Sequence, residues 1–249
     1  MFTLQIAEQI FTPISALIFD KDGTLENSRY YLEQLSAVRL ANLEKICPGI
    51  AKPLAQAYGF ELEQQTLDAR GLMAVGSRHD NMVAAAAYLA ERGQSWHDAW
   101  QLALDCFHQA DQQVVANPET CLMFPGTKAL LQQWQQAGIK IAILSAARQQ
   151  SVERFIQDHQ LASLVNGAAG SDQGLSKPDP ALYHQVCDAL HVASNETVMI
   201  GDAQGDINMA KNAGAKAAIN IQWPGSGNHY LKGADAMITT LQDLHIQAN

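Results

Sequence analysis

The segment Leu17–Leu25, with the sequence LIFDKDGTL, constrains the fold of this chain more than any other. An apolar run ends abruptly at Asp20, and Asp22 follows before a glycine and a threonine. Apolar side chains on both faces are typical of a strand in a parallel sheet that helices cover. The carboxyl ends of such strands are where open α/β sheets bind ligands. Two carboxylates at this point repel each other unless a cation or a shared proton compensates, so the pair predicts a metal-assisted or acid/base site.

The composition is that of a folded globular protein. Of the 249 residues, 47% are hydrophobic and 16% are charged, which argues against disorder. The formal net charge of −9 gives sequence-independent binding of nucleic acid no electrostatic support. The four cysteines include no CxxC pair, so we predict neither a zinc site nor a disulfide framework. No signal sequence and no run of about 18 apolar residues is present, so we expect a cytoplasmic protein without a membrane partner.

The sequence pattern separates a helical block from a region in which strands and helices alternate. After a first strand over 14–20, apolar residues recur at helical spacing up to about residue 117, with no convincing strand among them. From about residue 123 the pattern alternates. The expected strands are 139–144, 164–168, 197–200, 216–221 and 234–238, and the expected helices are 128–137, 148–159, 180–190, 207–213 and one that Thr240 caps.

This alternation predicts an α/β fold, a doubly wound, Rossmann-like parallel sheet with helices on both faces. We assign residues 1–26 and 117–249 to this core and residues 27–116 to an inserted all-α cap domain. Because the block follows the first strand directly, we expect it to lie above the carboxyl edge of the sheet, as a lid.

The sequence Asp-x-Asp-Gly-Thr after a hydrophobic strand resembles the first motif of the haloacid dehalogenase-like (HAD) hydrolase superfamily, whose members are mostly phosphatases. The resemblance implies that Asp20 is a nucleophile forming an aspartyl-phosphate and that Asp22 is the general acid and base. Gly23 permits the sharp turn, and Thr24 is expected to fix the phosphate-binding loop by hydrogen bonding. Lys21 has no assigned role, and a surface or salt-bridging lysine is its plainer interpretation. The structural alternative for the whole pentapeptide is an Asx-type turn.

Three further motifs follow in the order that the superfamily has them. Ser145 ends an apolar strand and is expected to bind a phosphoryl oxygen together with the backbone at Ala146, where the family more often has Asn. Lys177 is expected to offset the charge of the nucleophile and the phosphoryl group. Asp202 and Asp206 follow the next apolar strand. Taken alone, each has a plain structural interpretation: an N-cap serine, a loop lysine and a capping aspartate. Their order at successive strand or loop ends is what indicates the superfamily.

The resemblance also implies a Mg²⁺ cofactor. Mg²⁺ is a hard cation that prefers oxygen ligands, often one or two carboxylates together with water and a substrate phosphate. The expected ligands are Asp20, the backbone carbonyl of Asp22, and Asp202. For Asp206 three roles stay open: a direct ligand, a ligand through water, or a residue that only orients Lys177.

The inserted block offers candidates for substrate specificity but no motif. Arg70, Arg78 and His79 could reach an anionic substrate, although solvated positions on a helix surface are the plainer interpretation. Trp96 and Trp100, four residues apart, are expected in the core of the cap rather than on a sugar-binding face.

The leading hypothesis is Mg²⁺-dependent hydrolysis of a phosphate monoester, with a small phosphorylated metabolite as the partner. The alternatives are a sugar phosphomutase of the β-phosphoglucomutase type and a non-catalytic phosphate-binding regulatory protein. Asp20, Asp22, Lys177 and Asp202 occur together, which counts against the non-catalytic alternative, while Ala146 leaves it some room. Phosphoglycolate, sugar phosphates and nucleoside monophosphates all remain open as substrates.

Overall fold

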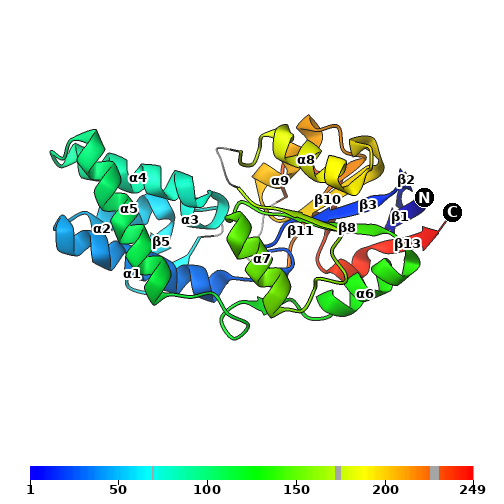
Figure 1. Cartoon of the computed structure of the whole chain (residues 1–249), viewed down its shortest axis with the longest axis horizontal. Coiled ribbons are helices and arrows are strands. Elements are labelled where there is room, and N and C mark those ends of the chain that lie inside the picture. Colours follow the sequence, from blue (N-terminus) through cyan, green and yellow to red (C-terminus); the bar gives the residue numbers. More distant parts are fainter. Residues whose placement is uncertain (69, 172–174, 225–229, 249) are drawn as a thin grey trace. The chain divides into compact units, whose positions relative to one another are not determined.

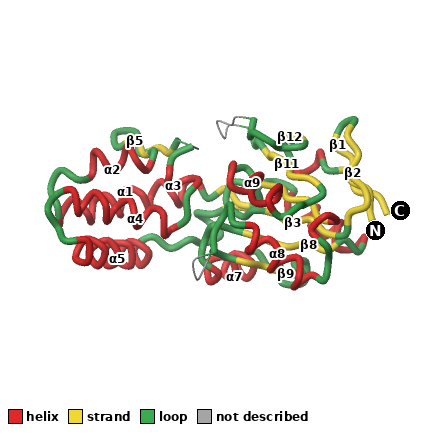
Figure 2. Tube along the Cα trace, turned by 90° about the horizontal axis from the view of Figure 1, so that it is seen from above, coloured by secondary structure: helices red, strands yellow, loops and turns green. Residues whose placement is uncertain are grey.

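The structure is a computed structural model that describes residues 1–68, 70–171, 175–224 and 230–248. The chain separates into two compact units. The core unit comprises Met1–Asn27 and Leu122–Asn249, and the helical unit comprises Ser28–Cys121. Figure 2 shows the difference in their make-up: strands and helices alternate through the core unit, whereas helix predominates in the other.

A parallel six-stranded sheet with the order β12-β11-β10-β3-β8-β9 forms the centre of the core unit. Its strands are β3 (Ala16–Phe19), β8 (Lys140–Leu144), β9 (Gly167–Ala169), β10 (Thr197–Gly201), β11 (Ala217–Ile221) and β12 (Ala236–Ile238). The helices are α6 (Thr127–Ala137), α7 (Gln149–Asp158), α8 (Pro180–Leu190) and α9 (Gln204–Asn212), with a 3₁₀ turn η1 (Ser194–Glu196). The predicted α/β fold class is confirmed.

Helices cover both faces of this sheet. Leu17 and Phe19 of β3 pack in a cluster with side chains of α6 and α7, and the ring of Phe19 stacks on that of Trp134 at 5.8 Å between centroids. Ala16 and Ile18 pack with α8 and α9 in a second cluster. Figure 1 shows α8 and α9 on one side of the strands and α6 and α7 on the other. This double burial is why the first strand is apolar at every position.

Local sequence signals set the ends of two core helices as predicted. Gly138 ends α6 in the left-handed conformation at φ 91°, which glycine adopts without steric cost. Asp179 caps α8 by accepting a hydrogen bond from the backbone N–H of Ala181, and Pro180 occupies the first helical position.

A second, antiparallel sheet at the chain ends was not predicted. Its strands, in the order β13-β1-β2, are β1 (Phe2–Ile6), β2 (Gln9–Ile14) and β13 (His245–Ala248). The expectation of a final helix after Thr240 is wrong: Thr240 caps only a 3₁₀ turn, η2 (Leu241–Asp243), before the chain extends into β13. Thr240 does cap a helical turn, but the chain then leaves the helical conformation because β13 forms backbone hydrogen bonds with β1.

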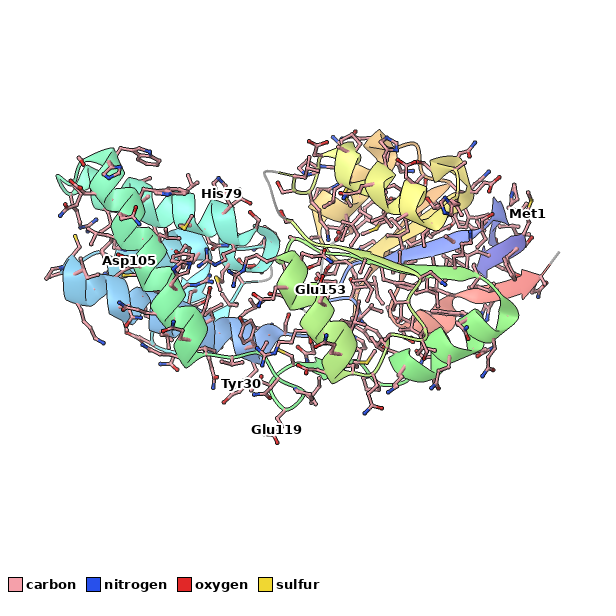
Figure 3. All side chains as sticks on the ribbon, viewed as in Figure 1. Met1, Tyr30, His79, Asp105, Glu119 and Glu153 are labelled. Atoms are coloured by element: carbon pink, nitrogen blue, oxygen red, sulfur yellow. The ribbon has the colours of Figure 1, made fainter. Side chains whose placement is uncertain are left out.

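The helical unit has its own apolar core, and Figure 3 shows its side chains gathered between the helices. Its helices are α1 (Arg29–Ile46), α2 (Ala51–Tyr58), α3 (Leu72–Val75), α4 (Arg78–Glu91) and α5 (Trp96–Gln113). Ser95 caps α5 by accepting a hydrogen bond from the backbone N–H of Asp98. The expectation that no strand interrupts this block is wrong, because β5 (Phe60–Glu61) and β6 (Thr66–Leu67) form a short hairpin after Gly59 turns the chain at φ 69°.

The ends of the chain segments that flank the helical unit pair with each other. β4 (Glu26–Asn27) and β7 (Leu122–Met123) form a two-stranded antiparallel ribbon. Among the residues that the structure describes, none of the helices is both long and apolar enough to cross a lipid bilayer.

Candidate active site

Three adjacent strands of the parallel sheet bring the predicted motifs together. β3 lies between β10 and β8, so residues at their carboxyl ends are neighbours although they are far apart in sequence. Asp20 follows β3, Ser145 follows β8 and Asp202 follows β10. The backbone N–H of Asp20 continues the ladder by donating to the carbonyl of Ile200 at 2.9 Å. The order of the motifs, as the resemblance has it, implies this convergence.

Three carboxylates form a cluster at this edge. One oxygen from each of Asp20, Asp202 and Asp206 lies within 4.8 Å of the others. Asp20 is only 5% exposed and Asp206 is fully buried. Carboxylates that are this close and this buried repel one another strongly without a compensating cation.

Lys177 supplies part of that compensation. Its Nζ lies 2.5 Å from Oδ1 of Asp20 and 2.5 Å from Oδ1 of Asp206. Burial opposes the charge of the ammonium, but the two carboxylates outweigh it and raise the pKa of Lys177 above its usual range. The lysine is therefore a fixed positive charge at the site.

One lysine is not enough for three acids. Burial, opposed by Lys177 and reinforced by the neighbouring carboxylates, raises the pKa of Asp20 to about 7. Burial and the charges of Asp20 and Asp206 raise the pKa of Asp202 well above its ordinary value. The site thus has excess negative charge. The clustered atoms that could bind a metal are carboxylate oxygens, which suit a hard divalent cation such as Mg²⁺.

Asp206 uses both carboxylate oxygens within the protein. Oδ1 pairs with Lys177, and Oδ2 accepts a hydrogen bond from the backbone N–H of Ala203 at 3.1 Å, closing the first turn of α9. Of the three roles left open for Asp206, this geometry favours the orientation of Lys177.

Ser145 contacts the second acid of the first motif. Its Oγ donates to Oδ2 of Asp22 at 3.4 Å and accepts from the backbone N–H of Ala147 at 3.0 Å. Ala146, which lies between Ser145 and Ala147 in the sequence just after β8, is half-buried. The serine hydroxyl therefore stands beside Asp22, at the strand end where the sequence predicts phosphate binding.

Thr24 is fully buried in the loop after the first motif. Its hydroxyl lies 3.5 Å from Oδ1 of Asp202, and its backbone carbonyl accepts a hydrogen bond from the indole of Trp223 at 3.0 Å. These contacts anchor the loop, which agrees with the expected hydrogen-bonding role. Its contact with a phosphate stays a prediction.

Lys21 is the feature that sequence reasoning underestimated. It is salt-bridged, as one interpretation had it, but it does not lie on the surface: it is 6% exposed. Its Nζ lies 2.6 Å from Oδ1 of Asp22 and 2.5 Å from Oε2 of Glu26. Burial opposes its charge, and the carboxylates of Asp22 and Glu26 raise its pKa above the usual range. The one sequence feature that could have indicated this contact is Glu26, a charged residue directly after the apolar Leu25.

The arginines of the helical unit differ in their surroundings. Arg70 is exposed and pairs with the neighbouring Asp68 at 3.4 Å. Arg78 pairs with Asp111 at 3.0 Å and lies over the ring of Phe107, so it is not a solvated surface residue. Its contacts are those of a residue that holds α4 to α5.

The aromatic residues of this unit only partly match the expectation. Trp100 is partly buried against the apolar core, but Trp96 is 55% exposed, so its assignment to the core is wrong. The first turn of α5 places Trp96 outside the buried stripe. Figure 3 shows His79 on α4, and its ring meets that of Trp100 edge-on at 5.6 Å.

Comparison with known proteins decides the family. A family model described as haloacid dehalogenase-like hydrolase matches residues 14–214. The chain belongs to this family. The match extends through all four motifs and confirms the resemblance inferred from them. The enzyme is therefore a HAD-like hydrolase.

Relatives of this HAD-like hydrolase carry more specific names. A phosphoglycolate phosphatase of Cupriavidus necator is 24% identical over 93% of this chain and 92% of its own length. Another, from Pseudomonas syringae pv. tomato, is 26% identical over 80% of this chain but only 66% of its own length.

Solved structures of the family share the fold. A HAD phosphatase from Thermococcus onnurineus has a TM-score of 0.59 at 19% identity, over 92% of this chain and 95% of its own. A β-phosphoglucomutase from Clostridium difficile has a TM-score of 0.60 at 14% identity, over 92% of both chains. At these identities the likeness concerns the fold alone.

Proposed function

We propose that this HAD-like hydrolase is a Mg²⁺-dependent phosphatase that hydrolyses a small phosphate monoester through an aspartyl-phosphate at Asp20. The observation that carries the proposal is the environment of Asp20. Its carboxylate contacts Lys177 at 2.5 Å, lies in a cluster with Asp202 and Asp206, and is followed two residues later by Asp22. This arrangement offers a nucleophile, a fixed cation, oxygen ligands and a nearby proton donor.

In the first step an oxygen of Asp20 attacks phosphorus while the ester P–O bond breaks. Asp22, protonated, gives its proton to the departing alkoxide oxygen. In the second step the oxygen of a water molecule attacks phosphorus, and its proton passes to Asp22. The bond between phosphorus and Asp20 breaks, which restores the carboxylate and releases inorganic phosphate. Lys177 and Ser145 are proposed to contact the phosphoryl oxygens.

Asp20, Asp202 and the backbone carbonyl of Asp22 would hold the cation. Mg²⁺, when bound, supplies positive charge that offsets the phosphoryl oxygens and the nucleophile. Asp206 is assigned to the orientation of Lys177, because both its oxygens already have partners.

Gly23 provides a test of this ligand assignment. A Cβ built at Gly23 would lie 2.0 Å from Oδ2 of Asp202, and its φ is +77°. We expect Gly23→Ala to displace Asp202 and to raise the Mg²⁺ concentration for half-maximal activity by at least about tenfold. Gly214→Ala is the matched control, because its φ is +72° but nothing lies within 4 Å of the added Cβ. Equal effects of the two substitutions on the Mg²⁺ titration would contradict the assignment.

The helical unit is proposed to be the cap that selects the substrate. In this proposal the helical unit closes over the sheet edge, excludes water and contacts the part of the substrate beyond its phosphate. The relatives named phosphoglycolate phosphatase make phosphoglycolate the first compound to test.

A phosphate-release assay tests the proposed function. The panel comprises phosphoglycolate, sugar phosphates and nucleoside monophosphates, each with Mg²⁺ and with EDTA. We expect turnover of at least one ester with Mg²⁺, loss of activity with EDTA, and recovery when Mg²⁺ is restored. A stable phosphoenzyme from hexose bisphosphates without phosphate release would favour a phosphomutase instead. Activity that persists in EDTA would contradict the metal requirement.

A further inference from the structure

A buried charge network lies next to the proposed acid/base residue. Lys21 contacts Asp22 and Glu26 at 2.6 and 2.5 Å. The other oxygen of Glu26, Oε1, lies 3.6 Å from Nε2 of His159. The side chain of Lys21 is 7% exposed and that of Glu26 is 4% exposed, whereas that of Asp22 is 28% exposed. Only the Asp22 end of the network therefore has substantial access to solvent.

A buried ion pair is weak evidence for a stabilising role. The desolvation of buried ion pairs is costly, and apolar residues of similar volume often replace them with no loss of stability. The surroundings are suited to such residues: the Nζ of Lys21 lies 5.6 Å from the ring centroid of Phe155, and Leu25 beside it is fully buried. The charges are better explained by what they do to Asp22.

The contacts fix the direction of the Asp22 carboxylate. Lys21 holds Oδ1, and the Ser145 hydroxyl donates to Oδ2 at 3.4 Å. The backbone of Lys21 is also fixed, because its carbonyl accepts from the N–H groups of Leu25 and Glu26 at 3.0 and 2.9 Å. Glu26 in turn occupies the first position of β4, paired with β7. The lysine is thus a rigid support with its charge directed at one oxygen of Asp22.

We propose that Lys21, held in place by Glu26, is a positioning residue that orients the Asp22 carboxylate for proton transfer. The inference rests on the proposed function, since it needs Asp22 to be the general acid and base. Neither Lys21 nor Glu26 is required to touch substrate. Asp22 serves two proton transfers, one to the leaving alkoxide and one from the attacking water, and both need the same carboxylate in a defined orientation.

The test compares leaving groups. An alkyl phosphate needs a proton for its alkoxide, whereas dinitrophenyl phosphate releases a stable phenolate without one. The variant is Lys21→Met/Glu26→Leu, which removes both members of the buried Lys21–Glu26 pair together, so that neither charge is left without the other. We expect kcat for the alkyl phosphate to fall by about 10²-fold. With dinitrophenyl phosphate we expect a wild-type first-turnover burst followed by a slow steady state, because only water attack still needs Asp22.

The outcomes separate this inference from the proposed function. Equal loss of the burst and of alkyl-phosphate turnover would overturn it, since a general structural defect affects both steps. Wild-type turnover of the alkyl phosphate by the double variant would overturn it as well. If the double variant does not fold, the same comparison on Glu26→Gln decides, with a smaller loss expected in the same pattern. If the wild-type enzyme forms no phosphoenzyme from either ester, the proposed function itself fails.

Discussion

Replacement of Asp20 by Asn is expected to lower kcat by roughly 10⁴-fold or more, because it removes the attacking oxygen of the reaction. The amide is nearly isosteric with the carboxylate, so the loss reports chemistry rather than packing. The measurement is Mg²⁺-dependent phosphate release from the best ester of the panel, at saturating substrate.

The matched control for this substitution is Asp188→Asn. Asp188 is an exposed residue of α8, and no predicted role depends on it. We expect the control to retain wild-type kcat and both variants to give the circular dichroism of the wild type. Activity of Asp20→Asn within tenfold of the wild type would remove the nucleophile assignment.

Replacement of Lys177 by Met is expected to lower both the stability of the fold and kcat. The side chain of Lys177 is 8% exposed, and its loss leaves Asp20 and Asp206 buried without their cation. Breaking such a pair from one side costs about 3–5 kcal/mol, so the free energy of unfolding in EDTA is expected to fall by that amount. Mg²⁺ is expected to restore part of the stability by binding only the folded state, while kcat stays low.

Lys211→Met is the matched control for Lys177→Met. The Nζ of Lys211 lies 2.5 Å from Oδ1 of Asp235, the same separation, but its side chain is 40% exposed. Solvent screening reduces such a pair to about 1 kcal/mol or less. Urea unfolding of both variants in EDTA measures the difference. Equal destabilisation by the two substitutions would show that burial does not make the Lys177 pairs special.

Much of the core unit could be predicted from sequence because its signals are local. The strand at β3 is apolar at every position, Gly138 stops α6, and the pair Asp179-Pro180 starts α8. Parallel strands share a carboxyl edge, and the resemblance to the HAD superfamily implied that Asp20 and Asp202 would meet there.

The remaining features depend on partners that are distant in sequence or inconspicuous. The pairing of Phe2 with Ala248 joins β1 to β13 at opposite ends of the chain. Both strands are too short for the sequence pattern alone to predict this pairing. The contact between Lys177 and Asp20 spans a sequence separation of 157 residues, so the resemblance could supply the role but not the geometry. No motif in the sequence includes Glu26, which the structure shows buried against Lys21.

The most direct test of the account is to identify the residue that becomes phosphorylated. The enzyme is mixed with Mg²⁺ and dinitrophenyl phosphate, quenched in acid within the first turnover, and reduced with borohydride, which converts an aspartyl-phosphate to homoserine. Peptide mass spectrometry then locates the modified position. A nucleophilic Asp20 gives homoserine at position 20 and leaves Asp22 unmodified. Modification at any other residue, or rapid turnover with no covalent intermediate, would contradict it.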